Sequence, residues 1–405
     1  MSDKGLDLSS KHAQAVLDRL YRFRIEVPSW GFADTGTRFG KFLQPAAAVD
    51  LDDKLADAAA VHEYTGITPT VAVHVLWDFP DGFDRSTCDK AEKLGIRIGS
   101  INPNLFQDQC YRFGSITNRD ESIRERAVRH MLDSVEIARQ TGSRDLSLWI
   151  ADGTNYPGQA DIRTRKQRAT DALRRVHEAM DGEMRMLVEY KPFEPAWYFT
   201  DFFDWGSAYI FAKSAGERAK VLVDTGHHLP GANIEQIVAW LIDERMLGGF
   251  HFNDRKYADD DLTVGSIDPY QAFRVLNEVA AWEYESGEDL DIAWMIDQSH
   301  NVKPKVQAMI QTACRVQELF AKALCVDREA LASARAAEDT VGAEEVLQKA
   351  FYTDVTPLLT EVRTRMGVPQ DPLAAFRDSG YEQKAAKARQ AKRESLGATG
   401  GGSYA

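Results

Sequence analysis

Short apolar runs alternate with longer amphipathic segments through most of the chain. Turn residues bound the runs and β-branched residues are frequent in them, which is typical of buried parallel strands. The segments between the runs have the periodicity of helices, so the pattern predicts consecutive βα units. The apolar runs occupy residues 22–28, 70–78, 96–102, 146–150, 184–192, 219–228, 247–254 and 291–298.

Helices are expected between and around these runs. Eight strands in strict alternation with helices predict a (β/α)₈ TIM barrel over residues 1–325. A doubly wound sheet also alternates, but it gives no reason for metal-binding side chains at the ends of four consecutive strands. The expected helices cover residues 8–20, 50–65, 84–94, 122–141, 161–180, 205–216, 233–245, 268–284 and 302–325.

The composition changes after Val326, where Ala, Glu, Lys, Arg and Leu dominate. Such a composition favours helices without a separate large core. We therefore expect residues 326–405 to form a C-terminal helical extension that packs on the barrel or on a neighbouring subunit. From about Gln383 the chain is rich in Ala, Lys and Arg and then in Gly, which predicts a mobile tail.

Side chains with metal-binding groups stand at the ends of the last four predicted strands. Because parallel strands of a barrel end at one mouth, these side chains are expected to converge. Three carboxylates and one imidazole suit Mn²⁺, Co²⁺ or Mg²⁺ better than a structural zinc site, which prefers Cys and His. A single Asp or His at a strand end is more often a hydrogen-bonded structural residue than a metal ligand. When four consecutive strands end in such residues, metal binding becomes the better explanation. The four are Glu189, Asp224, His251 and Asp297.

A second ion fits beside the first. His227 follows Asp224 by three residues, just past the strand end, and can share a metal with it; His228 is the alternative. Asp259 and Asp261 are two residues apart, so an extended segment would direct both carboxylates the same way. The sequence therefore predicts two divalent ions per chain, bridged by Asp224. Mn²⁺ is expected first, with Co²⁺, Mg²⁺ and Zn²⁺ as alternatives.

Composition narrows the classes of partner. The chain has 405 residues and is 44% hydrophobic, enough for one large core and an appendage. Its net charge of -13 disfavours nucleic acid, which needs a basic footprint. No apolar run reaches the about 18 residues of a membrane span, and the N-terminus lacks the apolar segment of a signal peptide. The four cysteines show no CxxC pairing. We expect a cytoplasmic protein that acts on a small molecule.

Taken together, the polar motifs resemble the two-metal site of xylose isomerase-like barrels. Those enzymes carry Glu at the position of Asp224 and Asp at the position of His251, so the match is incomplete. The segments Val223-Asp-Thr-Gly-His-His and Phe250-His-Phe-Asn-Asp-Arg are similar to L-rhamnose isomerases of broad specificity. The resemblance covers roughly residues 15–325, and the motifs that carry it are Glu189-x-Lys191, Asp224-x-x-His227, Asp259-x-Asp261 and Asp297.

This resemblance implies a metal-dependent isomerase that interconverts L-rhamnose and L-rhamnulose and tolerates other aldoses. One ion would hold adjacent oxygens of the open-chain sugar, and the second would hold a water that moves a proton between O1 and O2. A hydride would shift between C1 and C2. Lys191 would hydrogen-bond O1, and His74 would assist ring opening. Asp297 is also a candidate catalytic residue. If the reaction followed an enediol route instead of a hydride shift, Asp297 would be the base.

Aromatic residues are expected to contact the sugar. Trp30, Trp77 and Trp149 are candidates for its apolar edges, although each is about as well explained as a core residue. The loop Trp30–Phe42 is rich in Gly and aromatics and has no obvious place on its own barrel. Similar isomerases dimerise, so the resemblance implies that Phe39 walls a neighbour's active site in a homo-oligomer, with a tetramer favoured.

Three other functions compete. A ketose 3-epimerase of the same fold needs two acid/base carboxylates around one metal, whereas this chain offers ligands for two metals and a Lys after Glu189. A zinc phosphodiesterase of DNA repair would need three ions, more His ligands and a basic surface. A non-catalytic sugar-binding barrel would leave the seven candidate ligands unexplained.

Overall fold

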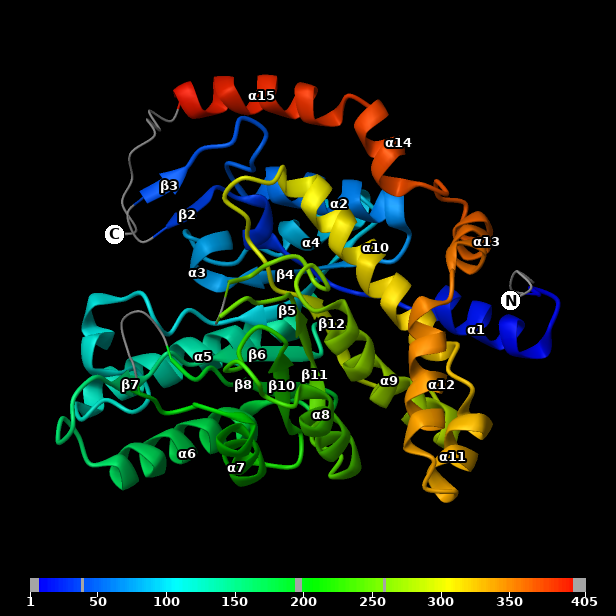
Figure 1. Ribbon diagram of the computed structural model, residues 1–405. Coiled ribbons are helices and arrows are strands. Elements are labelled where there is room, and N and C mark those ends of the chain that lie inside the picture. Colours follow the sequence, from blue (N-terminus) through cyan, green and yellow to red (C-terminus); the bar gives the residue numbers. More distant parts are fainter. Residues whose placement is uncertain (1–6, 38–39, 194–198, 258–259, 396–405) are drawn as a thin grey trace.

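Eight parallel strands form one sheet in the order β1-β4-β5-β6-β8-β10-β11-β12. The computed structural model describes residues 7–37, 40–193, 199–257 and 260–395. Glu26 N donates to Trp294 O and Ile296 N donates to Glu26 O, so hydrogen bonds join the last strand to the first. The fold is a (β/α)₈ TIM barrel, as predicted (Figure 1). Its strands are β1 (Val27–Pro28), β4 (Thr70–His74), β5 (Arg97–Asn102), β6 (Asp145–Trp149), β8 (Arg185–Glu189), β10 (Ala219–Asp224), β11 (Leu247–Phe252) and β12 (Ala293–Ile296).

Helices surround the sheet close to the predicted positions. The first strand is shorter than predicted, because α1 continues to Arg22 and only Val27–Pro28 pair as a strand. The second strand ends at His74, where a single helical turn, α3 (Val75–Asp78), replaces the expected continuation. The other helices of the barrel are α1 (Lys11–Arg22), α2 (Leu51–Thr65), α4 (Ser86–Lys93), α5 (Glu121–Thr141), α6 (Ile162–Ala179), α7 (Trp205–Ala215), α8 (Ile234–Asp243), α9 (Pro269–Ser286) and α10 (Lys305–Leu324).

Short elements that the apolar pattern did not predict occupy the loops. In the described residues, two small antiparallel strand pairs and two 3₁₀ turns lie in these loops. They are β2 (Thr35–Thr37) with β3 (Gly40–Phe42), β7 (Gly153–Thr154) with β9 (Phe199–Thr200), η1 (Ser29–Phe32) and η2 (Gln109–Phe113). Only β2 and β3 form a hairpin, because α6 and β8 separate β7 from β9 in the chain.

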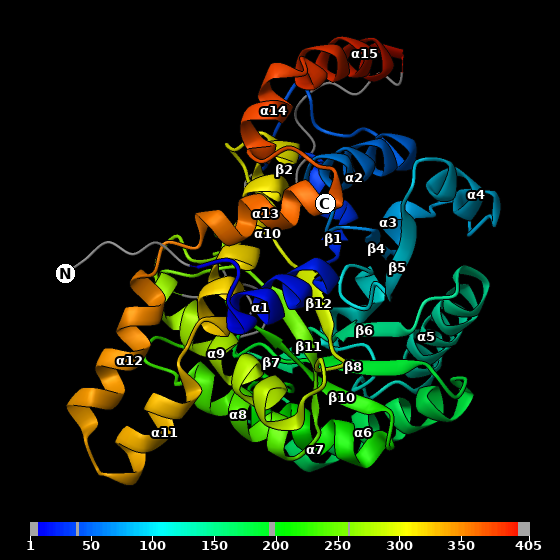
Figure 2. The same ribbon diagram turned by 90° about the vertical axis from the view of Figure 1, so that its right-hand side faces the viewer.

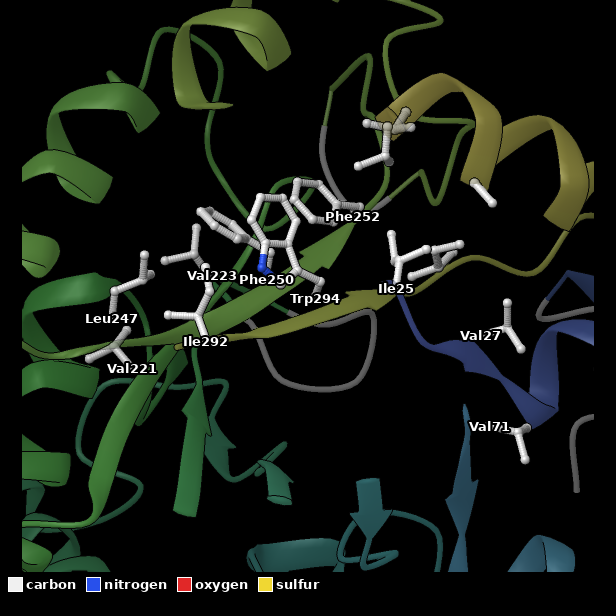
Figure 3. Packing of buried hydrophobic residues seen from close by; sticks show 14 of the residues in the cluster. Ile25, Val27, Val71, Val221, Val223, Leu247, Phe250, Phe252, Ile292 and Trp294 are labelled. Atoms are coloured by element: carbon white, nitrogen blue, oxygen red, sulfur yellow. The ribbon is translucent and has the colours of Figure 1, made fainter. Parts of the chain in front are cut away.

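Alternation along the strands divides the core into two parts. On the outer face, large side chains such as Phe250, Phe252 and Trp294 pack together between the sheet and the helices (Figure 3). The inner face holds a small separate cluster: Leu187, Leu222, Ala293 and Met295. Because successive side chains of a strand point to opposite faces, residues two further along point inward as well. Those residues are Glu189, Asp224 and Asp297.

The strand register brings polar residues to one level. Asp224 pairs with His251 across β10 and β11, and Trp149 pairs with Glu189 across β6 and β8. On the other side of the barrel, His74 pairs with Asn102. All of these residues stand at or near the carboxyl ends of their strands, so the parallel arrangement places them around the same mouth.

Five further helices follow the barrel, so the chain has a helical C-terminal region. Figure 2 shows them along one side and over the top of the molecule. Residues 383–395, part of the segment expected as a mobile tail, belong to the helix α15, and Arg389 of this helix is buried. The five are α11 (Arg328–Ala336), α12 (Thr340–Tyr352), α13 (Thr356–Met366), α14 (Pro372–Asp378) and α15 (Tyr381–Ser395). Among the described residues, none of the helices is long and apolar enough to cross a membrane.

Candidate metal centre and active site

Four predicted ligands meet at the mouth of the barrel. One ligand atom from each of Glu189, Asp224, His251 and Asp297 lies within 4.8 Å of every other. Glu189, Asp224 and His251 are at most 3% exposed. His251 Nδ1 lies 3.3 Å from Glu189 Oε2 and 3.5 Å from Asp297 Oδ2. The residues come from β8, β10, β11 and the end of β12, so the barrel brings together the whole predicted set.

Hydrogen bonds hold two of these carboxylates in place. The side-chain amide of Asn253 donates to both oxygens of Asp224 at 3.0 Å and to the main-chain carbonyl of Asp297. Gly226 N and His227 N also donate to Asp224 Oδ1. The indole of Trp30 donates to Asp297 Oδ1 at 2.8 Å. These contacts fix the carboxylates before any ligand arrives.

The three carboxylates, of which Asp297 is half-buried and the other two are buried, strongly perturb one another. Burial, together with Glu189 and Asp297, raises the pKa of Asp224 to about 7. Burial also raises the pKa of Asp297. Burial opposes charge on His251, but the surrounding carboxylates raise its pKa to about 9. These directions share one cause: the negative charges lie close together with few positive charges nearby, which favours a bound cation.

The same cluster fits a divalent cation. Glu189 Oε1 and His251 Nδ1 are buried; each lies 3.0–3.3 Å from a neighbouring residue of the site, but in a geometry that forms no hydrogen bond. Buried polar atoms are normally satisfied, so unsatisfied ones that point at a common centre need an explanation. Three carboxylates and an imidazole are donors that hard to borderline divalent ions accept. The site can therefore hold a metal ion.

Of the candidates for a second ion, His227 lies beside the first group. Its Nδ1 is 3.0 Å from Glu189 Oε1, and its Nε2 is 3.9 Å from Asp224 Oδ2. His228 lies elsewhere, because its Nε2 is 2.6 Å from the hydroxyl of Tyr190. Of the two histidines, only His227 lies beside the four-residue group; its role as a ligand stays a prediction.

The acidic segment after β11 is less regular than expected. Asp261 lines the cavity beside the metal-binding group. Its φ is 47°, in the left-handed region that Asp tolerates, so the backbone is not extended there as predicted. The carboxylate of Asp260 instead accepts hydrogen bonds from Lys256 N and Tyr257 N and closes a turn. Asp259 lies outside the described residues, as does Phe39.

A cavity of about 150 Å³ adjoins the four ligands. Aromatic rings form much of its wall. The His74 ring lies 4.6 Å from that of Trp30 and 4.3 Å from that of Trp77, measured between centroids. Phe106 continues the wall to Trp149 at 4.7 Å. The three predicted tryptophans therefore line the cavity, and Trp30 belongs to its own barrel, so part of the loop Trp30–Phe42 has a place there after all.

Lys191 and His74 stand on two sides of this cavity. Lys191 is buried, and its Nζ lies 4.9 Å from the centroid of Trp149. Burial, with Lys54 and His251 nearby, lowers the pKa of His74 to about 3. Its imidazole is therefore neutral near pH 7, and its Nδ1 is buried without a hydrogen-bond partner. A neutral imidazole can exchange a proton with a ligand, but it adds no charge to the site.

Several residues of the site were missed from the sequence. Asn102, Ser147 and Phe106 line the cavity, and Asn253 supports it from behind. A signal existed for Ser147, which is the one polar residue between Leu146 and Leu148 of an apolar strand; its hydroxyl is buried and unpartnered. Phe106 lies in the loop after β5, and the local sequence does not predict the path of that loop.

Comparisons with known proteins agree with this architecture. The family model "Xylose isomerase-like TIM barrel" matches residues 57–295. A probable sugar isomerase of Mesorhizobium japonicum is 40% identical over 391 residues, which are 95% of this chain and 90% of that protein. A probable sugar isomerase of Rhizobium meliloti is 40% identical over 407 residues, 99% of this chain and 92% of that protein. These relatives support an enzyme with an isomerase role.

Solved structures show the same fold. A D-allulose 3-epimerase from Methylomonas superposes with a TM-score of 0.54 at 14% identity, over 74% of this chain and 98% of that one. At this identity the likeness concerns the fold alone. The family match covers more than half of the chain, and the two relatives cover nearly all of it. The chain therefore belongs to the xylose isomerase-like TIM barrel family.

Proposed function

We propose that this protein is a metal-dependent aldose–ketose isomerase whose preferred substrate is an L-rhamnose-like sugar. The observation that carries the proposal is the combination of the four-ligand group with His227 and Lys191 around one small cavity. Glu189, Asp224, His251 and Asp297 would hold one divalent ion. His227 and Asp261, with Asp259, would hold the second. Bound there, the ions would polarise the two adjacent oxygens of the sugar.

The residues of the chain then have distinct roles. Lys191 is buried beside Trp149, so its ammonium would donate to O1 and favour negative charge on that oxygen. His74 is neutral, so its imidazole would take and return a proton as the sugar ring opens. In the isomerisation, hydrogen would pass from C2 to C1 with its electron pair, while a proton passes from O2 to O1. The aromatic wall would shield the reacting carbons from water.

The same wall favours a deoxy sugar. Trp30, Trp77, Phe106 and Trp149 give the cavity an apolar lining beside its carboxylates. A methyl group there loses no hydrogen bond, whereas a hydroxyl would give up its bonds to water. An aldose with a methyl group at C6, such as L-rhamnose, suits this surface, and other aldoses would bind more weakly.

The decisive experiment is an assay of aldose–ketose conversion over a panel of sugars. We expect turnover of L-rhamnose in the presence of Mn²⁺ and weaker turnover of aldoses that carry a C6 hydroxyl. Heat-treated protein and metal-free buffer serve as controls. Conversion of none of the aldoses, in protein shown to contain metal, would reject the proposal.

A ketose 3-epimerase is the second candidate. Glu189 and Asp297 both line the cavity and both contact His251, so two carboxylates are present around one metal position. Lys191 and His227 beside them favour the isomerase. Metal content separates the two, because the isomerase needs two ions per chain and the epimerase needs one. Incubation of ketoses alone would reveal a 3-epimer if the second candidate were correct.

We also propose that the protein is a homo-oligomer, with a tetramer favoured, in which Phe39 reaches a neighbour's cavity. The division at residue 325 between barrel and extension stays a prediction. Light scattering after size-exclusion chromatography measures the assembly, and a monomer with full activity would reject it.

A further inference from the structure

Two arginines of the last helix bind one loop. Arg389 and Arg393 are four residues apart, so they lie on the same side of α15. Arg389 donates to the main-chain carbonyl of Ala46. Arg393 donates to those of Gln44, Pro45 and Ala47, at 3.0–3.2 Å. Four consecutive carbonyls are thus held by two guanidinium groups. Figures 1 and 2 show α15 lying over this part of the barrel.

Ion pairs fix the helix at the same place. Arg393 also bonds to Asp34 Oδ2 at 2.7 Å, and both side chains are only 13% exposed. Arg389 contacts both carboxylate oxygens of Asp57 on α2, at 2.8 and 3.0 Å. Asp57 is fully buried and also accepts from the hydroxyl of Tyr381. Since these pairs are shielded from water, they hold their geometry better than pairs on an exposed surface.

The loop held by α15 reaches the active site on two sides. Ala48 N donates to Phe32 O at 2.9 Å, two residues after Trp30. The side-chain amide of Gln44 donates to His300 O and Asn301 O, in the segment that follows Asp297. Trp30 and Asp297 are the two residues whose side chains meet in the indole–carboxylate bond of the site. Segment 44–48 therefore contacts the chain on both sides of that bond.

We propose that α15 is a clamp for the active-site wall. Arg393 is a positioning residue that holds segment 44–48, and through it the Trp30 indole, against Asp297; Arg389 anchors the helix to α2. Loss of Arg393 removes the hydrogen bonds to three main-chain carbonyls and the positive charge that pairs with Asp34. The loop then gains freedom, and Trp30 spends less time at Asp297. The kinetic part of this inference rests on the proposed isomerase function.

The kinetic test compares Arg393→Ala with Lys387→Ala, an exposed cation on the same helix. With the metal-loaded full chain, Arg393→Ala should raise KM for L-rhamnose about fivefold, a coupling of about 1 kcal/mol, and change kcat less than twofold. Arg393→Lys keeps a cation opposite Asp34 and should recover part of that loss. In a Trp30→Phe background, Arg393→Ala should raise KM little further. A full additional fivefold rise there would overturn the idea that Arg393 acts through Trp30.

A second readout needs no turnover. Hydrogen exchange at the amides of Gln44 and Ala48 should be at least tenfold faster in Arg393→Ala than in Lys387→Ala, since those amides donate to Asp34 Oδ1 and Phe32 O and so tie the clamped segment to the chain beside Trp30. Asp34→Asn breaks the same ion pair from the loop side and should give the same change if Arg393→Ala folds poorly. Unchanged exchange in both variants overturns the clamp. Faster exchange in a protein that converts no aldose would support the clamp and reject the isomerase proposal.

Discussion

The indole of Trp30 donates a 2.8 Å hydrogen bond to Asp297 Oδ1, across 267 positions of the chain. One partner is an aromatic wall residue of the cavity and the other belongs to the four-ligand group. The bond therefore couples the shape of the sugar pocket to the orientation of a carboxylate that we propose as a metal ligand.

Replacing Trp30 by Phe keeps an aromatic ring and removes only the N–H donor. A hydrogen bond to a charged group is worth about 1.5–3 kcal/mol, so KM for the sugar should rise about tenfold and Mn²⁺ should bind more weakly. Steady-state kinetics and calorimetric titration of Mn²⁺ measure the two effects. If KM and the affinity for Mn²⁺ both stayed at their wild-type values, the hydrogen bond would have no role in binding sugar or metal.

Removal of divalent ions should abolish turnover. The three carboxylates of the group, left without a cation, repel one another, so the site gains most from an ion that accepts oxygen ligands. After dialysis against a chelator, activity should fall to background, and Mn²⁺ or Co²⁺ should restore it. Full turnover in excess chelator would contradict the proposed dependence on metal.

Two adjacent histidines offer a matched pair for the second ion. His227→Ala should lower kcat at least tenfold and spare much of the sugar affinity, because it damages only one of the two proposed ions. His228→Gln should have little effect on kcat, since His228 contacts Tyr190 instead. Metal content per chain provides the check: His227→Ala should retain one ion, and Glu189→Gln should lose more. Two fully occupied ions in His227→Ala would exclude His227 as a ligand.

The proposed reaction transfers hydrogen without exchange with water. An enediol route needs a carboxylate beside C2 that is free of metal. Among the described residues, the carboxylates that line the cavity are Glu189, Asp261 and Asp297, and each is already proposed as a ligand. Aldose labelled with deuterium at C2 should therefore give ketose that keeps the label at C1, as measured by NMR. Washout of the label at a rate near turnover would indicate proton transfer, with Asp297 as the first candidate for the base.

The buried pair Arg389–Asp57 predicts a pH-dependent loss of stability. Burial raises the pKa of Asp57 to about 6 even with Arg389 present, above the unfolded value of about 3.9. The folded chain thus binds this proton more tightly, and the contribution of Asp57 to stability falls as the pH rises from about 4 through 6. Without Arg389, the charged carboxylate is buried alone, and the free energy of unfolding should fall by about 3 kcal/mol at pH 8.

At pH 5 the carboxyl of the Arg389→Ala variant can stay protonated, so its loss of stability should be smaller than at pH 8. Urea unfolding of variant and wild type at both pH values measures the difference. Adding Asp57→Asn removes the titrating group and should make the loss independent of pH. An equal loss at pH 5 and pH 8 for Arg389→Ala alone would show that Asp57 does not carry the effect.

The sequence by itself determined the barrel and the group of four candidate ligands. Strand runs such as 219–224 end in Asp224, and apolar alternation with a period of two fixes which residues share a face, whatever the rest of the fold does. Parallel strands joined by helices end at one mouth, so Glu189, Asp224, His251 and Asp297 had to converge. These inferences needed only local pattern and one rule of topology.

Tertiary structure decided the contacts between distant loops. That Trp30 meets Asp297, that Asn253 holds Asp224 and that Arg393 binds Asp34 depends on loop paths, which follow no hydrophobic period. Residues 383–395 are rich in Ala, Lys, Arg and Gln, which favour a helix. This helix lies on the barrel, where Arg389 binds the buried carboxylate of Asp57, 332 positions earlier in the chain. Such an ion pair cannot be predicted from the local sequence, because each partner alone looks like an ordinary charged residue of a helix.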